Sequence, residues 1–134
     1  VPAIDMAEFG RTLTLNVTAQ VALIAAFDAA LKKSEAGRVV ALTSSVGANP
    51  RAFWGAYGAS KAALENLVHS YGEEVKNLSS IRVAIVDPAK TRTKMRADAY
   101  PGEDPATVKD PSVVGDAIAE LLATDFVTGH RLIL

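Results

Sequence analysis

The chain has 134 residues, a length that suits one domain with a sizeable buried core. Hydrophobic residues make up 49% and charged residues 22% of the sequence, close to the average of globular proteins, which excludes a disordered or low-complexity chain. The net charge is -1 and the basic residues are scattered, which argues against a nucleic-acid-binding surface, and no run of about 18 unbroken apolar residues predicts a membrane span.

Cysteine is absent, so disulfide bonds and thiolate metal sites are excluded, and we predict no metal site. No basic stretch leads into an apolar core at the start of the sequence, as a secretion signal would require. We therefore expect a cytoplasmic protein whose partner is a small molecule rather than a nucleic acid or a membrane.

The first half of the chain predicts a long helix, a buried strand and a loop. Asp5 and Glu8 have the spacing of a capping box, so we expect a helix to begin there and to run to about residue 33, with many alanines along its middle. After Gly37, four apolar residues at 39–42 predict a strand buried on both faces. Residues 43–55 are polar and contain glycine, and they predict a loop.

The second half continues this alternation. A second helix is predicted over residues 56–76 and a second buried strand over residues 81–86. The polar stretch 90–110 is rich in turn-forming residues and predicts a loop or short helices. Asp110 followed by Pro111 predicts the start of a third helix that runs to about residue 123, and Gly129 precedes a last short strand over 130–134.

Alternating helices and strands predict an α/β fold, in one domain over residues 1–134, with a parallel sheet covered by helices. Domains of this kind that bind dinucleotides open with a strand and a glycine-rich turn, which seats a pyrophosphate on a helix N-terminus. No such turn precedes the first helix, because Gly10 and Gly37 stand alone. We therefore expect only the last three strands of such a sheet, with their flanking helices.

Tyr57 and Lys61 are the central chemical signal. Four residues apart on a helix, they lie on one face within mutual reach. A lysine cation favours the phenolate form, so we expect the pKa of Tyr57 to fall toward neutrality, which would let the phenol exchange a proton with an alkoxide or an alcohol. The alternative is an ordinary surface pair, because this spacing is common by chance.

Ser44 stands thirteen residues before Tyr57, just after the strand predicted over 39–42. Ligands bind at the carboxyl ends of strands in open α/β sheets, and a hydroxyl there can donate to a substrate carbonyl. The alternative is a loop serine that satisfies turn hydrogen bonds, and for the neighbouring Ser45 we favour that alternative.

Two further segments are candidates. Asn16 lies in the middle of the first helix, where asparagine is a poor helix former. It is either a tolerated surface amide or an amide that interrupts the helix and holds a water. Residues 88–93 follow the second buried strand, either as part of a ligand site or as an ordinary proline-terminated loop.

In this order and spacing, the motifs resemble the second half of a short-chain dehydrogenase/reductase (SDR), and the resemblance covers essentially the whole chain. Its specificity is high because four motifs fall at the spacing of the family. The resemblance implies part of a Rossmann-like, doubly wound parallel sheet. The matching segments are Leu15-Asn16-Val17, residues 37–45, Tyr57 with residues 60–64, Ile81-Arg82-Val83, and Pro88 with Thr91 and Thr93.

The resemblance implies an oxidoreductase that uses NAD or NADP to interconvert a carbonyl and an alcohol. Tyr57 would be the general acid/base, Ser44 would orient the substrate carbonyl, and Lys61 would lower the pKa of the tyrosine. Asn16 would support a water in a proton relay, and residues 94–110 would form a lid over the substrate. The residues implied in cofactor binding are Tyr57, Lys61, Pro88, Thr91 and Thr93.

Two departures from the family pattern matter. The family usually has Pro-Gly after the second of these strands, whereas this chain has Pro88-Ala89, and a methyl group there would crowd the nicotinamide or oppose a positive φ. The N-terminal half, which holds the glycine-rich turn and selects NAD or NADP, is absent. We interpret the chain as a fragment of a larger enzyme, and we predict that the fragment alone binds no cofactor.

Such a fragment would leave the edge of its first strand open. In the family the two long helices pack against a partner subunit, so we expect a homo-oligomer formed through the helices 6–33 and 56–76. Two hypotheses follow: the parent protein is an oxidoreductase, or the 134-residue species is a catalytically silent module for folding or oligomerisation.

Overall fold

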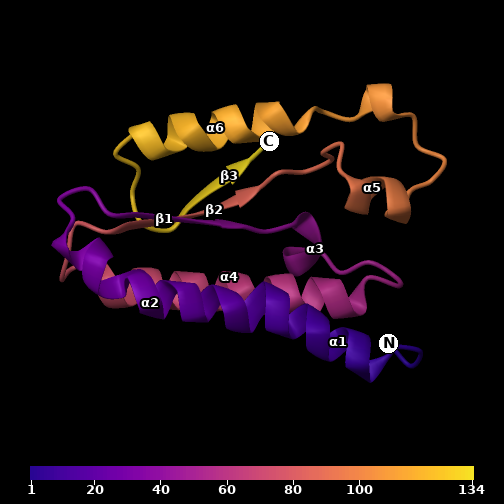
Figure 1. Ribbon diagram of the computed structural model, residues 1–134, viewed down its shortest axis with the longest axis horizontal. Coiled ribbons are helices and arrows are strands. Elements are labelled where there is room, and N and C mark those ends of the chain that lie inside the picture. The colour runs from indigo at the N-terminus through magenta and orange to yellow at the C-terminus, as the bar shows by residue number, and fades with distance from the viewer.

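Three parallel strands form the centre of the molecule, and helices cover both faces of the sheet (Figure 1). The computed structural model describes residues 1–134. The strands lie in the order β1 (Arg38–Leu42), β2 (Arg82–Asp87) and β3 (His130–Ile133), and both neighbouring pairs run parallel. The predicted α/β fold with a parallel sheet of three strands is confirmed.

Long helices lie on one side of the sheet and a shorter helix on the other. α1 (Met6–Leu13) and α2 (Ala19–Lys33) are joined by the π-helical turn η1 (Thr14–Thr18) into one continuous rod, which packs along α4 (Gly55–Val75). α6 (Pro111–Ala123) covers the opposite face of the sheet (Figure 1). The rod begins where predicted, because the Asp5 carboxylate accepts hydrogen bonds from the backbone N–H groups of Ala7 and Glu8 at 2.8 and 2.9 Å.

The remaining elements are short and surround the carboxyl edge of the sheet. The segment 43–55, predicted as a loop, contains the single helical turn α3 (Ser45–Ala48). The polar stretch 90–110 contains α5 (Lys94–Ala99) and the 3-10 turn η2 (Pro105–Thr107), as predicted. The Thr93 hydroxyl caps α5, and the Asp110 carboxylate caps α6.

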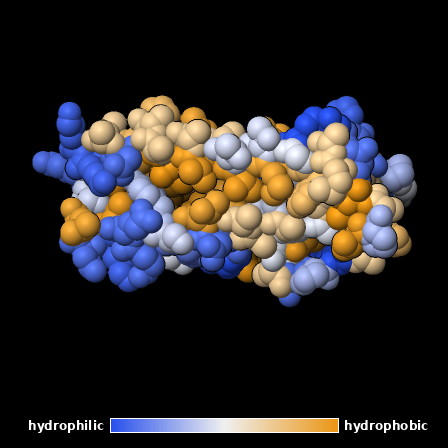
Figure 2. Space-filling view, turned by 90° about the horizontal axis from the view of Figure 1, so that it is seen from below, coloured by the Kyte–Doolittle hydropathy of each residue, from blue (hydrophilic) through white to orange (hydrophobic).

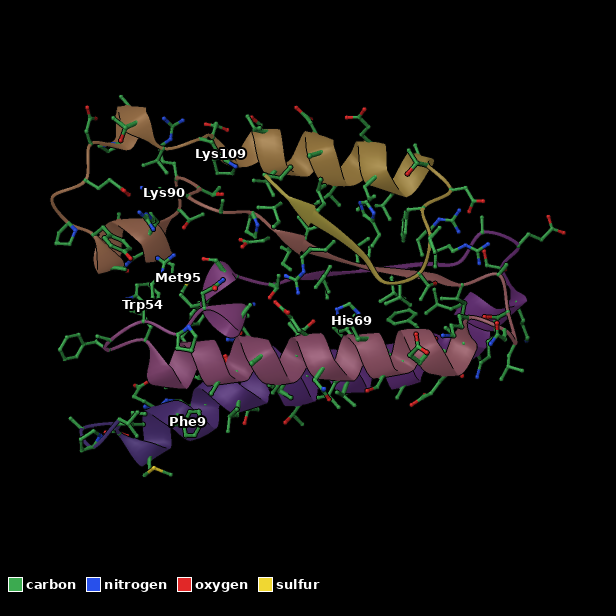
Figure 3. The ribbon with its side chains drawn as sticks, turned by 180° about the vertical axis from the view of Figure 1, so that it is seen from behind. Phe9, Trp54, His69, Lys90, Met95 and Lys109 are labelled. Atoms are coloured by element: carbon green, nitrogen blue, oxygen red, sulfur yellow. The ribbon has the colours of Figure 1, made fainter.

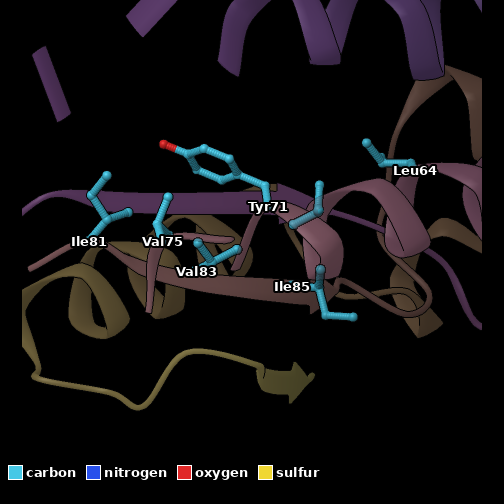
Figure 4. Close-up of a cluster of buried hydrophobic side chains, with 7 residues drawn as sticks. Leu64, Tyr71, Val75, Ile81, Val83 and Ile85 are labelled. Atoms are coloured by element: carbon cyan, nitrogen blue, oxygen red, sulfur yellow. The ribbon is translucent and has the colours of Figure 1, made fainter. Parts of the chain in front are cut away.

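The core follows the alternation of side chains along β2. Val83 and Ile85 face α4 and join its apolar residues in one cluster (Figure 4). Ala84 and Val86 point to the other face and pack with α6 and the segment before β3. Since β2 lies between the other two strands and is buried on both faces, it fixes where their carboxyl ends meet. The first cluster contains Leu64, Val68, Tyr71, Val75, Ile81, Val83 and Ile85.

β1 lies at an edge of the sheet and pairs only with β2, as predicted for this strand. Between β1 and α2 runs an apolar groove of about 510 Å³, to which Leu23, Phe27 and Leu31 contribute from the helix. Leu23 and Phe27 remain 52% and 58% exposed. Figure 2 shows apolar residues gathered along the middle of the helical side of the molecule.

The rod from Met6 to Lys33 is long and apolar enough, by length and composition alone, to cross a membrane. The rod contains no run of 18 unbroken apolar residues, because Gln20 and Asp28 stand on either side of its longest apolar stretch. Unbroken apolar runs alone therefore did not identify it. A mostly buried core helix of a soluble protein passes the same test, whereas none of this segment is buried within the single chain. Here Asp28 accepts a hydrogen bond at 2.9 Å from the Tyr71 hydroxyl of α4, so the rod is tied to the sheet-covering helix.

Candidate active site

A cavity of about 470 Å³ lies at the carboxyl ends of β1 and β2. The segments that follow these strands, the beginning of α4 and the helix α5 form its walls. Parallel strands end at the same edge of a sheet, so polar residues that follow different strands come together there. The lining residues are Leu42, Thr43, Ser44, Ser45, Val46, Arg51, Trp54, Tyr57, Lys61, Asp87, Pro88, Ala89, Lys90, Thr91, Thr93, Met95, Arg96, Ala99 and Tyr100.

Ser44, Tyr57 and Lys61 all line this one cavity. The Lys61 Nζ atom lies 5.8 Å from the centroid of the Tyr57 ring and donates a hydrogen bond to the carbonyl oxygen of Leu42 at 3.0 Å. Ser44 is the extended residue before α3, a helical turn that packs against α4. The structure therefore brings together the three side chains that the sequence singled out.

The pKa of Tyr57 does not follow the sequence-based expectation. Burial raises the pKa of Tyr57 above its ordinary value, the Ser44 side chain opposes this rise, and the Asp87 carboxylate adds to it. The Lys61 ammonium, which is engaged by the Leu42 carbonyl, does not offset the loss of solvent around the phenol. The expected fall toward neutrality is wrong for this structure, and Tyr57 is a protonated phenol at neutral pH.

Lys61 is followed, one helical turn along α4, by a buried carboxylate that sequence analysis missed. Glu65 is only 9% exposed and accepts hydrogen bonds from the Thr43 hydroxyl and from the Arg131 guanidinium of β3. Burial raises the pKa of Glu65, but the bonds from Arg131 and Thr43 outweigh it and hold this pKa below its usual value. For Lys61, burial lowers the pKa and the Glu65 carboxylate opposes the change. Glu65 thus ties the residue that follows β1, and the strand β3, to the helix that carries Tyr57 and Lys61.

Asn16 lies in the π-helical turn η1, so the helix is widened at this residue rather than ended. Its Nδ2 atom donates to the Ser60 hydroxyl at 3.0 Å, and that hydroxyl donates to the Tyr57 carbonyl oxygen at 2.7 Å. Asn16 does not itself line the cavity. The alternative of a tolerated surface amide is wrong, because this amide bonds to a fully buried serine on the turn that carries Tyr57.

Pro88, Thr91 and Thr93 all line the cavity from the segment that follows β2. The Thr91 hydroxyl donates to the Pro88 carbonyl oxygen at 2.9 Å. The Thr93 hydroxyl oxygen accepts a hydrogen bond from the backbone N–H of Arg96 at 3.2 Å, so its own O–H remains free to donate. Ser45 also lines the cavity, and its hydroxyl accepts a hydrogen bond from Arg51, which is compatible with the loop role favoured for it.

Ala89 adopts a φ of 50°, in the left-handed region that the glycine of the family pattern tolerates without strain. The conflict expected from the Pro-Ala sequence is therefore present in the structure. A hydrogen bond from the Ala89 N–H to the Asp87 carboxylate, at 2.9 Å, holds the turn in this conformation. The backbone beside the cavity is strained at this residue.

A row of aromatic and charged side chains also borders the cavity, and the sequence did not predict the contacts within it. The Trp54 ring lies 5.8 Å from the Tyr57 ring and is stacked on Tyr100 with 5.9 Å between ring centroids. The Arg96 guanidinium lies 3.8 Å from the centre of the Tyr100 ring and donates to both carboxylate oxygens of Glu103, at 2.6 and 2.7 Å. These contacts hold α5, which belongs to the predicted lid, against the start of α4; Figure 3 shows Trp54 and Met95 at this end of the molecule.

The fold and the site together define an α/β protein with a cavity at the carboxyl ends of its parallel strands that is lined by a phenol, a hydroxyl and an ammonium group. The family model described as short chain dehydrogenase matches residues 1–104. The chain belongs to the short-chain dehydrogenase family.

Relatives of this chain are oxidoreductases. It is 40% identical over 113 residues to the uncharacterized oxidoreductase YciK of Escherichia coli K12, a match that covers 84% of this chain and 44% of that protein. It is 35% identical over 91 residues to the vibriobactin-specific 2,3-dihydro-2,3-dihydroxybenzoate dehydrogenase of Vibrio cholerae, covering 68% of this chain and 34% of that protein.

The fold is also that of solved structures. A short chain dehydrogenase of Escherichia coli CFT073 in complex with NADPH superposes with a TM-score of 0.93 at 35% identity, and the match covers 99% of this chain and 55% of that chain. The chain thus spans about half the length, or less, of the relatives it matches.

Proposed function

We propose that the gene product containing this chain is a nicotinamide-dependent oxidoreductase that interconverts a carbonyl compound and an alcohol. The observation that carries the proposal is that Ser44, Tyr57 and Lys61 line one cavity at the carboxyl edge of the sheet. The complex of the Escherichia coli CFT073 relative with NADPH and the dehydrogenase activity in the name of the Vibrio relative support it. Residues 1–134 would form part of a single domain of that enzyme.

The residues of the cavity fit the nicotinamide end of such a cofactor. Thr93 has a free O–H donor, which suits a carboxamide oxygen, and the Lys61 ammonium has donors beyond its bond to Leu42. When bound, the reduced cofactor supplies a hydride, and the protein supplies orientation and a proton. We propose that Tyr57, Lys61, Pro88, Thr91 and Thr93 hold it.

The proton chemistry follows from the state of the cavity side chains. Tyr57 is protonated because burial raises its pKa, so it can donate its proton to the oxygen of a carbonyl that is being reduced. The Ser44 hydroxyl would donate a hydrogen bond to the same oxygen, and the Lys61 ammonium would stabilise the phenolate that remains. Asn16, bonded to Ser60 on the same helical turn, would support a water in the relay that returns the proton to Tyr57.

Replacing Tyr57 with phenylalanine tests the proposal in the gene product that contains this chain. We expect turnover in an NADPH-oxidation assay, with a panel of carbonyl compounds, to fall at least about 100-fold, because a general acid contributes roughly 10²–10⁴. The NADPH dissociation constant should change little. Tyr71→Phe is the matched control, since Tyr71 lies on the same helix but outside the cavity. A Tyr57→Phe enzyme that keeps most of its rate would refute the assignment.

The open edge of β1 and the apolar groove beside it favour a second proposal for the 134-residue chain by itself, namely that it acts only as a module for folding or oligomerisation. We propose that this species alone is catalytically silent and binds neither NAD nor NADP, because the glycine-rich turn of the family is not in it. Titration of the isolated chain with NADPH and NADH, followed by cofactor fluorescence, should show no binding. Binding in the micromolar range would overturn this proposal.

The exposed apolar residues of the long helices support a homo-oligomer. Leu23 and Phe27 of α2 and Leu67 of α4 are all exposed in the single chain. We propose that the helices 6–33 and 56–76 pack against a second copy. Size-exclusion chromatography with light scattering should give the mass of at least a dimer, and a compact monomer would contradict the proposal.

A further inference from the structure

The lining of the cavity is strongly biased toward positive charge. Arg51, Lys61, Lys90 and Arg96 contribute four cations, whereas Asp87 contributes the single carboxylate. The whole chain has no such bias, since it has 14 basic and 15 acidic residues. The Asp87 carboxylate is buried and accepts the hydrogen bond from Ala89. The cavity lining therefore has more positive than negative charges.

Two of the four cationic side chains already bind groups of the protein. Lys61 donates to the Leu42 carbonyl and lies beside Tyr57. Arg96 is neutralised by its two hydrogen bonds to Glu103. The other two, Arg51 and Lys90, form no ion pair within the chain; the one side-chain hydrogen bond of Arg51 goes to the Ser45 hydroxyl at 3.2 Å. The Arg51 charge is therefore available to a ligand, and Lys90 is available in part, since its charge adds to that of Arg96 in lowering the pKa of Glu103.

Arg51 is well placed for such a ligand. Its guanidinium contacts Ser45, the residue that follows Ser44, and both Arg51 and Ser44 line the cavity in which the carbonyl is proposed to react. Trp54 and Met95 supply apolar surface in the same cavity, and Figure 3 shows both at the end of the molecule that also carries Lys90. The cavity thus offers a polar reaction point, an apolar surface and unpaired cations.

This inference rests on the proposed oxidoreductase function. We propose that the substrate carries an anionic oxyacid group, which is a carboxylate or a phosphate. Arg51 is the main residue that binds this group, and Lys90 is the second. An arginine binds such groups through two parallel N–H donors, and charge-assisted bonds of this kind are stronger than bonds to neutral groups. The apolar part of the substrate contacts Trp54 and Met95. Arg51 and Lys90 are thus specificity-determining residues.

The test uses Trp54, the one tryptophan of the chain, as a reporter within the cavity. In a single-tryptophan variant of the gene product that contains this chain, the fluorescence of Trp54 is titrated with phenylacetate and with its neutral isostere phenylacetamide. We expect phenylacetate to bind about fivefold more tightly, because a hydrogen bond to a charged group is worth roughly 1 kcal/mol more than a neutral one. Arg51→Gln should abolish this preference, Lys90→Gln should reduce it, and the remote surface change Arg11→Gln should leave it intact.

A second measurement separates the substrate from the phosphates of the cofactor as the source of the anion. The NADPH dissociation constant of Arg51→Gln should equal that of the parent enzyme within about twofold. Equal binding of the acid and the amide, or a loss in Arg51→Gln that falls on NADPH instead, would overturn the inference. Neither result depends on turnover, so a failure of the inference is distinguished from a failure of the oxidoreductase function, which the Tyr57→Phe assay detects.

Discussion

The ion pair between Glu65 and Arg131 allows a quantitative prediction about the stability of the site. Replacing Glu65 with leucine removes the acceptor of three hydrogen bonds, one from Thr43 and two from Arg131. The buried Thr43 hydroxyl then lacks a partner, which costs about 1–3 kcal/mol. The Arg131 side chain is 35% exposed, so water compensates part of its loss. We expect Glu65→Leu to lower the free energy of unfolding by about 3 kcal/mol, toward the lower end of the range for a broken buried pair.

A double-mutant cycle isolates the pair. Arg131→Met leaves the Glu65 carboxylate buried without its charged partner, and we expect a loss of about 3 kcal/mol for this change as well. The double variant Glu65→Leu/Arg131→Met should lose roughly 2 kcal/mol less than the sum of the two single changes. Urea unfolding of the gene product, with the midpoint and slope of each transition, supplies the four free energies. Additivity within about 0.5 kcal/mol would refute the coupling of these two side chains.

The same pair has a pH signature. Because the pKa of Glu65 is lowered in the folded protein, its contribution is present above the unfolded value of about 4.3 and is lost as the pH falls through the folded value. The stability difference between the parent and Glu65→Leu should therefore stay constant from neutral pH down to about pH 5 and shrink below about pH 4. A difference that grows on acidification would contradict the ion pair.

Three further changes test other parts of the structure. Ala89→Gly relieves the φ of 50°, so thermal unfolding should show a gain of up to about 1 kcal/mol, and a loss would contradict the strain at this residue. Ile85→Ala empties a fully buried site in the cluster under α4, and urea unfolding should show a loss of about 2–5 kcal/mol; a loss below 1 kcal/mol would mean that this core is loosely packed. Gly37→Ala would place a Cβ atom 2.9 Å from the Leu31 carbonyl oxygen and 3.1 Å from Ile81 Cγ1, so a loss of about 1–3 kcal/mol is expected, and an unchanged midpoint would contradict this close approach.

Local rules predicted most of the secondary structure and the core of the site. Apolar periodicity and capping residues act over a few positions, so the long helices and the three strands were predicted to within a residue or two, whereas the short turn α3 was predicted as loop. Tyr57 and Lys61 share a helical face by spacing alone, and Ser44 reaches the same cavity because parallel strands end at one edge.

What the sequence missed depends on contacts between distant segments. Glu65 and Arg131 are 66 positions apart, and no periodicity links them. The shift predicted for the pKa of Tyr57 had the wrong direction, because the segments that bury the phenol come together only in the folded chain. For Ala89 the sequence predicted the conflict with a positive φ but not the hydrogen bond to Asp87 that accompanies it.

The π-helical turn η1 contains one residue more than an α-helical path would need. Each residue of an α-helix advances the direction of the side chains by about 100°, and the widened turn absorbs this advance, so α1 and α2 continue as one rod. Deleting one residue from Thr14–Thr18 would restore a regular α-helical path without re-aiming Met6–Leu13. The effect would fall on the turn itself, where Asn16 bonds to Ser60, so the loss of one codon would displace this amide while the flanking helices stay in phase.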